Sequence, residues 1–210
     1  MESRVTSTTK ARLLLLLLLS TLTISDGNAA SALVVVAGQP CLRFWSGVAC
    51  NAAGRVAGLT IRGAGVTGTL DALDFSALPA LASLNLSGNH LAGAIPVNVS
   101  LLTSLASLDL SSNDLTGGIP AASMLRGLRA LVLRNNPLGG RIPSSLLAAL
   151  RRLDLQAVRL LGTSPTELGR LTALSFLDLS RNSLSGELPP SFAGMTKMKE
   201  LYLSRNNLRV

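Results

Sequence analysis

The chain has 210 residues, of which 48% are hydrophobic but only 3% aromatic, so any core must be built mainly from aliphatic side chains. This length gives room for one domain and at most a small second one. The formal net charge of +8 is compatible with nucleic acid, a membrane surface or an acidic extracellular ligand, and charge alone does not choose among them.

The first 32 residues have the three parts of a secretory signal peptide. Arg4, Lys10 and Arg12 precede an apolar run from Leu13 to Leu19, and a small-residue triplet, Ala30-Ser31-Ala32, follows. The run is shorter than the ~20 residues that a membrane span needs, and no later segment is long enough to cross a bilayer. We therefore predict a signal peptide at 1–32 and a secreted protein, which would lie at the cell surface if a longer, membrane-anchored form exists.

Both cysteines of the chain, Cys41 and Cys50, lie close to the only tryptophan, Trp45. Two nearby cysteines in an exported chain usually oxidise to a disulfide. The only histidine, His90, is distant in the sequence, so a zinc ion at the cysteines would lack ligands. The sequence therefore favours a Cys41–Cys50 disulfide over a metal or redox site, and we expect no metal and no cofactor.

A unit of roughly 24 residues recurs about seven times from residue 56 onwards. Its pattern is L-x-x-L-x-L-x-x-N-x-L-x-G-x-I-P, and its clearest copies are residues 81–96, 105–120, 128–143 and 174–189. The unit at 150–165 departs from it, with Val158 at the Asn position and Ser164 at the Ile position. The unit at 56–70 has Ala64 at the Asn position, and the unit from residue 198 stops before the pattern is complete.

The pattern predicts one short strand and one tight turn in each unit. Alternating leucines such as Leu84 and Leu86 suit a half-buried strand, and the Asn side chain can satisfy backbone groups in the turn that follows. The glycines of the pattern, Gly93, Gly117, Gly140 and Gly186, allow unusual backbone angles there. One unit cannot bury its leucines alone, so the units must stack. We predict an α/β solenoid with a right-handed superhelix and a parallel sheet on one side.

This pattern resembles that of leucine-rich repeat (LRR) proteins, and the G-x-I-P ending resembles the plant-specific subclass found in ectodomains of receptor-like kinases and receptor-like proteins. The stretch around Cys41, Trp45 and Cys50 looks like the N-terminal cap of that family, in which paired cysteines and a tryptophan close the end of the leucine core. The resemblance implies domains at 1–32 (signal peptide), 33–55 (cap) and 56–210 (repeats). The helix that usually opens the cap is missing between Leu33 and Pro40, so the cap is truncated. We also expect an open apolar edge beyond the strand that ends at Leu203.

Catalysis has little support in the sequence. No kinase signature occurs, and His90 is expected to be a solvent-facing turn residue. Asp109, Asp154 and Asp178 recur at one position of the repeat, and we interpret this row as a solvated surface ladder rather than as a catalytic pair. We predict that the chain is not an enzyme.

The repeat lacks its asparagine at Val158. This residue is expected to leave backbone groups of its turn without a partner, at a cost of ~1–3 kcal/mol.

Binding has more support, because outward strand positions of a curved solenoid share one concave surface. Nine of the sixteen arginines fall between residues 126 and 181. Arginine forks suit planar oxyanions, and aromatic side chains suit the role of apolar anchors. The predicted ligand-binding residues on the concave face are Arg129, Arg134, Arg151, Arg152, Gln156, Phe176, Arg181 and Tyr202. Solubilising surface charge is the alternative interpretation of the arginines.

Two N-glycosylation sequons begin at Asn85 and Asn98. Asn98 is expected on the convex side, whereas a glycan on Asn85 would cover part of the concave face and direct ligands to the later repeats.

The resemblance implies an extracellular recognition module that binds a peptide, glycan or protein ligand in plant receptor-type signalling, in development or defence, with a co-receptor kinase as a further partner. Nucleic acid is a poor partner for a secreted protein. One alternative is a secreted inhibitor of cell-wall hydrolases, resembling polygalacturonase inhibitors. Another is a non-functional receptor fragment.

Overall fold

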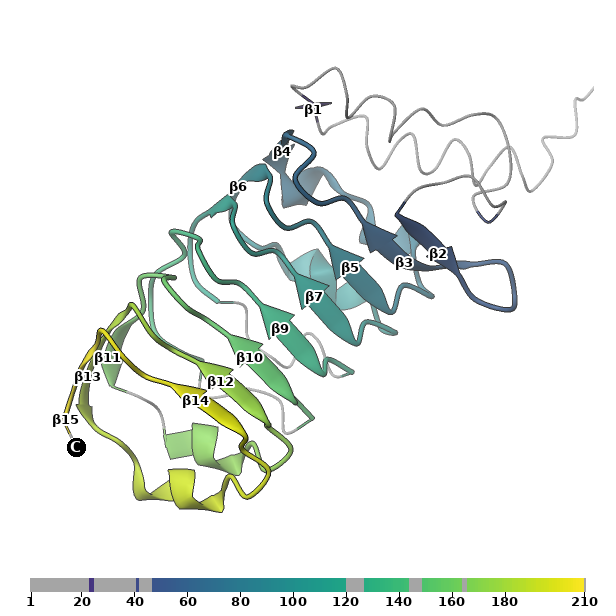
Figure 1. Ribbon diagram of the computed structural model, residues 1–210. Coiled ribbons are helices and arrows are strands. Elements are labelled where there is room, and N and C mark those ends of the chain that lie inside the picture. Colours follow the sequence, from purple (N-terminus) through teal and green to yellow (C-terminus); the bar gives the residue numbers. More distant parts are fainter. Residues whose placement is uncertain are drawn as a thin grey trace, which may run out of the picture.

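The computed structural model describes residues 23–24, 41, 47–119, 127–143, 149–163 and 166–209. Trp45, the segment from Leu33 to Pro40, and Ser164 lie outside the described residues, as does most of the predicted signal peptide. The exception is β1 (Thr23–Ile24), which pairs antiparallel with residues 66–67. From residue 47 onwards the described residues wind into an elongated stack of similar turns (Figure 1).

One large sheet runs along the stack and confirms the predicted parallel strands. Its strands, in spatial order, are β14 (Glu200–Tyr202), β12 (Phe176–Asp178), β10 (Arg152–Asp154), β9 (Ala130–Val132), β7 (Ser107–Asp109), β5 (Ser83–Asn85), β3 (Val56–Thr60) and β2 (Val48–Cys50). Only β2 is antiparallel to its neighbour within this sheet. The middle residue of each strand of this sheet from β5 to β12 is a buried leucine, such as Leu108 or Leu177, so the alternation seen in the sequence places one row of leucines in the core.

Most of the turns then form a second strand, and these strands make two separate small sheets. The first contains β1, β4 (Val66–Thr69), β6 (His90–Gly93) and β8 (Asp114–Leu115). The second contains β11 (Leu161–Thr163), β13 (Ser183–Glu187) and β15 (Asn207–Arg209). The unit between them carries Pro137 one residue after its asparagine, where the neighbouring units have a residue with an amide hydrogen. Proline cannot donate to a ladder, and we attribute the break between the small sheets to it.

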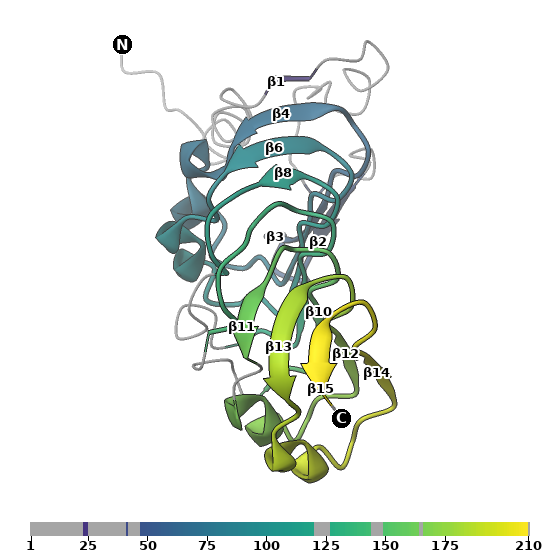
Figure 2. The same ribbon diagram turned by 90° about the vertical axis from the view of Figure 1, so that its left-hand side faces the viewer.

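The helical segments lie on the side of the stack opposite the large sheet (Figure 2). They are η1 (Leu70–Ala72), η2 (Phe75–Ala77), η3 (Val97–Leu101), η5 (Thr166–Arg170) and η6 (Pro190–Gly194), and within the described ranges all are 3₁₀-helices. The described connections are thus 3₁₀-helices and not the α-helices that the predicted α/β class implies. Connections this short leave room for only one tight turn. No helix in the described ranges has the length and apolar character that crossing a membrane requires.

A ladder of asparagine side chains joins successive turns. Asn113 accepts a hydrogen bond from the amide of Leu91 at 3.0 Å and donates to the carbonyls of Leu86 and Leu110, each at 3.0 Å. Asn89, Asn136, Asn182 and Asn206 repeat this arrangement. Each asparagine thus bonds its own unit and the unit before it, as the sequence predicted for the turn.

The ladder is interrupted at Val158, which is fully buried. The two carbonyls that an asparagine here would contact, those of Leu133 and Leu155, each keep one bond, to Asn136 and Asn182. The carbonyl of Val158 itself accepts from the amide of Gly139 at 2.7 Å. The expectation that Val158 leaves backbone groups without partners is wrong for these carbonyls, because Asn136 and Asn182 each bridge two units.

The residue before each asparagine position adopts left-handed backbone angles. The φ values are 54° at Ser112, 56° at Asn135 and 58° at Arg181. The same position in the other units is held by Gly63, Gly88, Ala157 and Arg205, all with positive φ. Non-glycine residues reach this conformation only at a cost, so the repeat imposes it whatever side chain is present.

The predicted disulfide between Cys41 and Cys50 is confirmed, with the two Cα atoms 5.6 Å apart. Cys50 ends β2, which pairs with β3, so the bond ties residue 41 to the first end of the large sheet. At the other end, β14 pairs only with β12 among the described strands, and Leu201 in its middle is 42% exposed.

Candidate functional site

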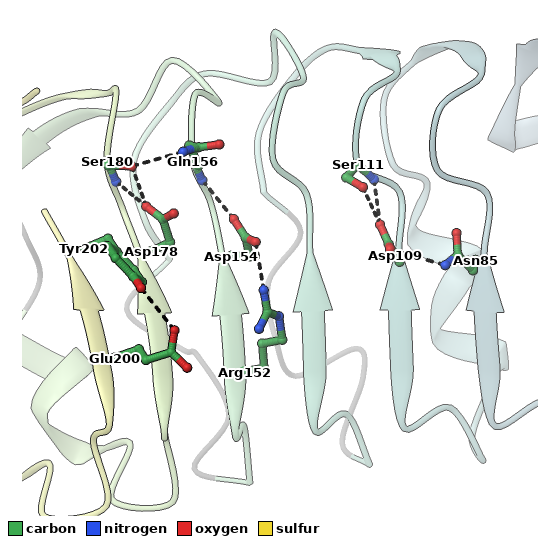
Figure 3. A network of polar contacts seen from close by, with 10 residues as sticks. All are labelled: Asn85, Asp109, Ser111, Arg152, Asp154, Gln156, Asp178, Ser180, Glu200 and Tyr202. Carbon is green, nitrogen blue, oxygen red and sulfur yellow. Dashed lines mark hydrogen bonds and ion pairs between the residues drawn. The ribbon is translucent and has the colours of Figure 1, made fainter. Parts of the chain in front are cut away.

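The outward-facing residues of the large sheet form two registered columns, which we call the sheet face. The first column is Ser83, Ser107, Ala130, Arg152, Phe176 and Glu200, and the second is Asn85, Asp109, Val132, Asp154, Asp178 and Tyr202. Residues in the early strands are small and mostly uncharged, whereas those in β10, β12 and β14 are large, aromatic or charged. Figure 3 shows the polar contacts of this face.

Arg152, Phe176 and Tyr202 stack on one another across three strands, and we call them the platform. The guanidinium carbon of Arg152 lies 3.6 Å from the centroid of the Phe176 ring. The rings of Phe176 and Tyr202 are 5.8 Å apart and tilted by 50°. A cation over an aromatic ring and a tilted aromatic pair are both attractive arrangements, so the platform is held in place before any ligand arrives.

The hydroxyl of Tyr202 at the end of the platform remains protonated. It donates a hydrogen bond to a carboxylate oxygen of Glu200 at 3.1 Å (Figure 3). This bond and the negative charge of Glu200 raise the pKa of Tyr202 above its ordinary value. Tyr202 is 47% exposed and is thus an accessible neutral phenol at physiological pH.

The row of aspartates is not the solvated ladder that the sequence suggested. Asp178 accepts hydrogen bonds from the amide of Ser180 at 2.8 Å and from its hydroxyl at 2.6 Å. Asp109 does the same with Ser111, and Asn85 with Ser87. These side chains close the turn two residues downstream, and Asp154 and Asp178 are buried. The aspartates recur because their carboxylates accept hydrogen bonds from backbone amides two residues downstream, and not because the face needs exposed charge.

Asp154 differs from its neighbours because Gln156 replaces the serine of the motif. Its carboxylate accepts from the Gln156 amide at 3.4 Å and pairs with Arg152 at 3.2 Å (Figure 3). Only 2% of the Asp154 side chain is exposed. Burial raises the pKa of Asp154 above its ordinary value, and the adjacent Asp178 adds to the rise. The Gln156 amide, Arg134 and Arg152 oppose the rise without cancelling it.

The predicted ligand-binding residues do not form a single strip. Arg152, Phe176 and Tyr202 come together as the platform. Gln156 lies just beyond β10, where it donates to the Ser180 hydroxyl at 3.4 Å, and Arg134 is close enough to act on the charge of Asp154.

The other three predicted arginines lie off the strands. Arg129 and Arg151 precede β9 and β10, and Arg181 lies in a left-handed turn after β12. Each of these strands has only three residues. Arg129 and Arg151 therefore lie at the edge of the sheet where the strands begin, and Arg181 lies at the edge where they end. Whether any of the eight residues binds a ligand stays a prediction.

His90 and the two sequon asparagines occupy different surroundings. His90 is exposed, as expected, but it begins strand β6 instead of lying in a turn, and its Nδ1 is 3.7 Å from a carboxylate oxygen of Asp114. Asn98 is exposed in η3, and Asn85 is half-buried in β5, where its amide donates to Asp109 at 3.3 Å. Glycosylation of either asparagine remains a prediction. Among the residues that the structure describes, no cluster of three or more His, Cys, Asp or Glu side chains is arranged to hold a metal ion.

Sequence reasoning missed the roles of Asp154, Asp178 and Glu200. The signal for Asp178 was present as an Asp-x-Ser pattern at 178–180, repeated at 109–111 and as Asn-x-Ser at 85–87, whereas Asp154 has Gln156 in place of the serine. A short acceptor followed two residues later by a serine is typical of a side chain that closes a turn. Nothing local in the sequence indicates the contact between Glu200 and Tyr202.

Family models described as leucine rich repeat match the chain at residues 80–102, 104–123, 127–148 and 148–208. Among curated proteins, the Arabidopsis thaliana serine/threonine-protein kinase BRI1-like 1 is 46% identical over 48 residues. That match covers 23% of this chain but only 4% of the kinase.

Among solved structures, a pollen receptor kinase 3 structure is similar with a TM-score of 0.79 and 29% identity, over 91% of this chain and 92% of that one. The plant peptide hormone receptor RGFR1 in complex with RGF2 is similar with a TM-score of 0.61 and 31% identity, over 63% of this chain and 22% of that one. The chain thus spans less than a quarter of that receptor and nearly all of the former structure.

Proposed function

Because the chain is a plant leucine-rich repeat protein that resembles the ectodomains of receptor kinases, we propose that it is an extracellular recognition module that binds a peptide ligand on its sheet face in receptor-type signalling. It acts by binding and not by turnover. A co-receptor kinase is the further partner that this role implies. The receptor RGFR1, whose structure contains the peptide hormone RGF2, supports the class of ligand.

The platform is the observation that carries the proposal. Arg152 is held over Phe176 at 3.6 Å, yet 43% of its side chain is exposed. Its guanidinium therefore keeps donors free for a ligand carboxylate while its position is fixed. Phe176 and Tyr202 offer an aromatic surface beside it, and anchors of this kind dominate many binding interfaces.

The small residues of the early strands complete the site. The first column begins with Ser83, Ser107 and Ala130, and Gly58 of β3 extends it by one strand. Short side chains let the backbone of an extended peptide approach the sheet closely, while Arg152 at the end of the row receives a carboxylate. We propose that the peptide lies across the strands, with an acidic group or free C-terminus on the platform.

Selection from a random peptide library with free C-termini, followed by calorimetry on synthetic peptides, tests the proposal. We expect Arg152→Gln to weaken binding about ten-fold, and amidation of the peptide C-terminus to weaken it to a similar extent. Arg62→Gln is the matched control, because Arg62 is an exposed arginine at the start of the stack. A library that yields no binder, or equal losses for Arg152→Gln and Arg62→Gln, contradicts the proposal.

A further inference from the structure

A pocket of ≈ 510 Å³ lies at the edge of the large sheet, beside the starts of β10, β12 and β14. Three cationic side chains line it: Arg151, Lys197 and Lys199. The hydroxyl-bearing residues Ser175 and Thr196 also line it, and no acidic residue does. The volume is in the range of small-molecule sites and exceeds that of a single inorganic anion.

Backbone hydrogen bonds fix the chain positions of two cationic residues of this pocket, Arg151 and Lys199. The carbonyl of Arg151 accepts from the amides of Ser175 at 2.8 Å and Phe176 at 3.1 Å. The carbonyl of Ser175 accepts in turn from the amides of Lys199 at 2.9 Å and Glu200 at 3.1 Å. The hydroxyl of Ser175 also donates to the Arg151 carbonyl at 3.0 Å. Arg151 and Lys199 are therefore held at the same place in units two strands apart, about 10 Å from each other along the sheet.

The positive charge of the pocket is not neutralised within the described chain. The ion pairs found there join His90 to Asp114 and Arg152 to Asp154, and neither involves Arg151, Lys197 or Lys199. Earlier units carry Ala82 and Ala106 at the position that Arg151 and Lys199 occupy, with the same pair of backbone bonds. The fold does not need a cation at this position, so structure alone does not account for the charge.

We propose that this pocket binds a sulfate or phosphate ester. Arginine forks pair with two oxygens of a phosphate or sulfate group as they do with a carboxylate, and lysine ammonium groups bind such oxygens as compact, rotatable point charges. Two lysines and one arginine around an open, polar pocket fit a tetrahedral oxyanion, and the remaining volume accommodates the group that carries it. This site does not depend on the proposed role of the sheet face.

Nuclear magnetic resonance titration of the ¹⁵N-labelled protein at constant ionic strength tests the proposal, with phenyl sulfate, phenyl phosphate and acetate as probes. We expect saturable shifts of the Ser175, Lys197 and Lys199 amides with one or both esters, and at least about ten-fold weaker binding of acetate. The two ester titrations identify which ester is preferred. Acetate binding as tight as that of both esters overturns the assignment, as do shifts centred elsewhere.

Paired variants separate a built site from general positive charge. The double variant Lys197→Gln/Lys199→Gln should weaken ester binding about ten-fold or more. Arg62→Gln/Arg209→Gln removes the same charge from two exposed residues outside the pocket and should change binding less than about two-fold. Equal weakening by both pairs overturns the proposal. Arg152→Gln should leave ester binding unchanged, so failure here is distinguishable from failure of the sheet-face proposal, and melting curves of all variants verify folding.

Discussion

At the scale of single residues, the buried asparagines stabilise the stack because each one hydrogen-bonds the backbones of two successive units. Asn113 is 6% exposed and connects the backbones of two units through its amide group. Replacing it by alanine removes an acceptor for the Leu91 amide and leaves polar groups buried without that partner. We expect Asn113→Ala to lower the free energy of unfolding by about 2–3 kcal/mol, measured by urea denaturation.

Asn98→Ala is the control for this variant, because Asn98 is exposed in η3. In protein made without glycosylation it should change stability by less than about 0.5 kcal/mol. Similar losses in both variants would show that the asparagine ladder does not stabilise the stack.

Asp154 should make stability depend on pH. Its pKa is raised in the folded state, mainly by burial, so between its ordinary pKa and the raised value the folded protein binds more protons than the unfolded chain. Stability must therefore fall as the pH rises through this window. Asn85 shows that an asparagine fits the same column of the sheet.

We expect Asp154→Asn to be more stable than the original protein at pH 7, with the difference shrinking towards pH 4. Thermal melting across this pH range measures the effect, with Asp71→Asn, an exposed change in η1, as the reference. A variant that is less stable at pH 7 would mean that the pairing of Asp154 with Arg152 outweighs the cost of burying the charge.

At the scale of elements, the contact between η5 and η6 depends on one glycine. A Cβ atom on Gly169 would lie 2.2 Å from the carbonyl oxygen of Ser191, which the backbone cannot tolerate. We expect Gly169→Ala to separate these helices and to lower stability by about 1–3 kcal/mol in chemical denaturation. Gly118→Ala is the matched change, since a Cβ there meets nothing within 4 Å. Equal losses in both variants would show that the cost does not come from the contact with Ser191.

The elements also show what the sequence could and could not predict. The strands with buried Leu108 and Leu177 followed from alternation, because burial on one face of a strand has a period of two. The 3₁₀ form of segments such as 97–101 did not follow, because short connections carry little periodicity. The Arg152–Phe176 contact depends on register between units 24 residues apart, and the alignment of the repeats already contained that register.

The burial of Asp154 and Asp178 could not be predicted from residue type, because isolated carboxylates usually prefer water. It depends on a partner two residues downstream, which is a local pattern that charge counting ignores. The pocket beside Lys199 was missed for another reason. Lys197 and Arg151 are far apart in the sequence and belong to no motif, so only the stacked structure brings them together.

At the scale of the whole molecule, two interruptions divide the stack near the same place. The small sheets are separate on either side of the unit with Pro137, and the asparagine ladder lacks one member, at Val158, before it resumes at Asn182. The large sheet continues through both. Cooperativity between repeats depends on such contacts between neighbours, so the two parts should open partly independently.

Val158→Asn should rejoin the ladder. An asparagine at this position has the carbonyls of Leu133 and Leu155 as acceptors and the amide of Leu138 as a donor, by analogy with Asn113. We expect a gain of about 1 kcal/mol after the lost burial of valine, together with slower hydrogen exchange at Leu138. A less stable variant with unchanged exchange would show that packing at Val158 matters more than continuity of the ladder.

The doubly accepting carbonyls at the strand starts, such as those of Ala106 and Arg151, have a consequence for protein engineering. They hold neighbouring turns in register without using any side chain, so alanine, arginine, serine and lysine all occupy this position in a single chain. A designer can therefore rewrite the sheet edge residue by residue, choosing charge or size for a chosen ligand, while the scaffold that presents those residues stays the same.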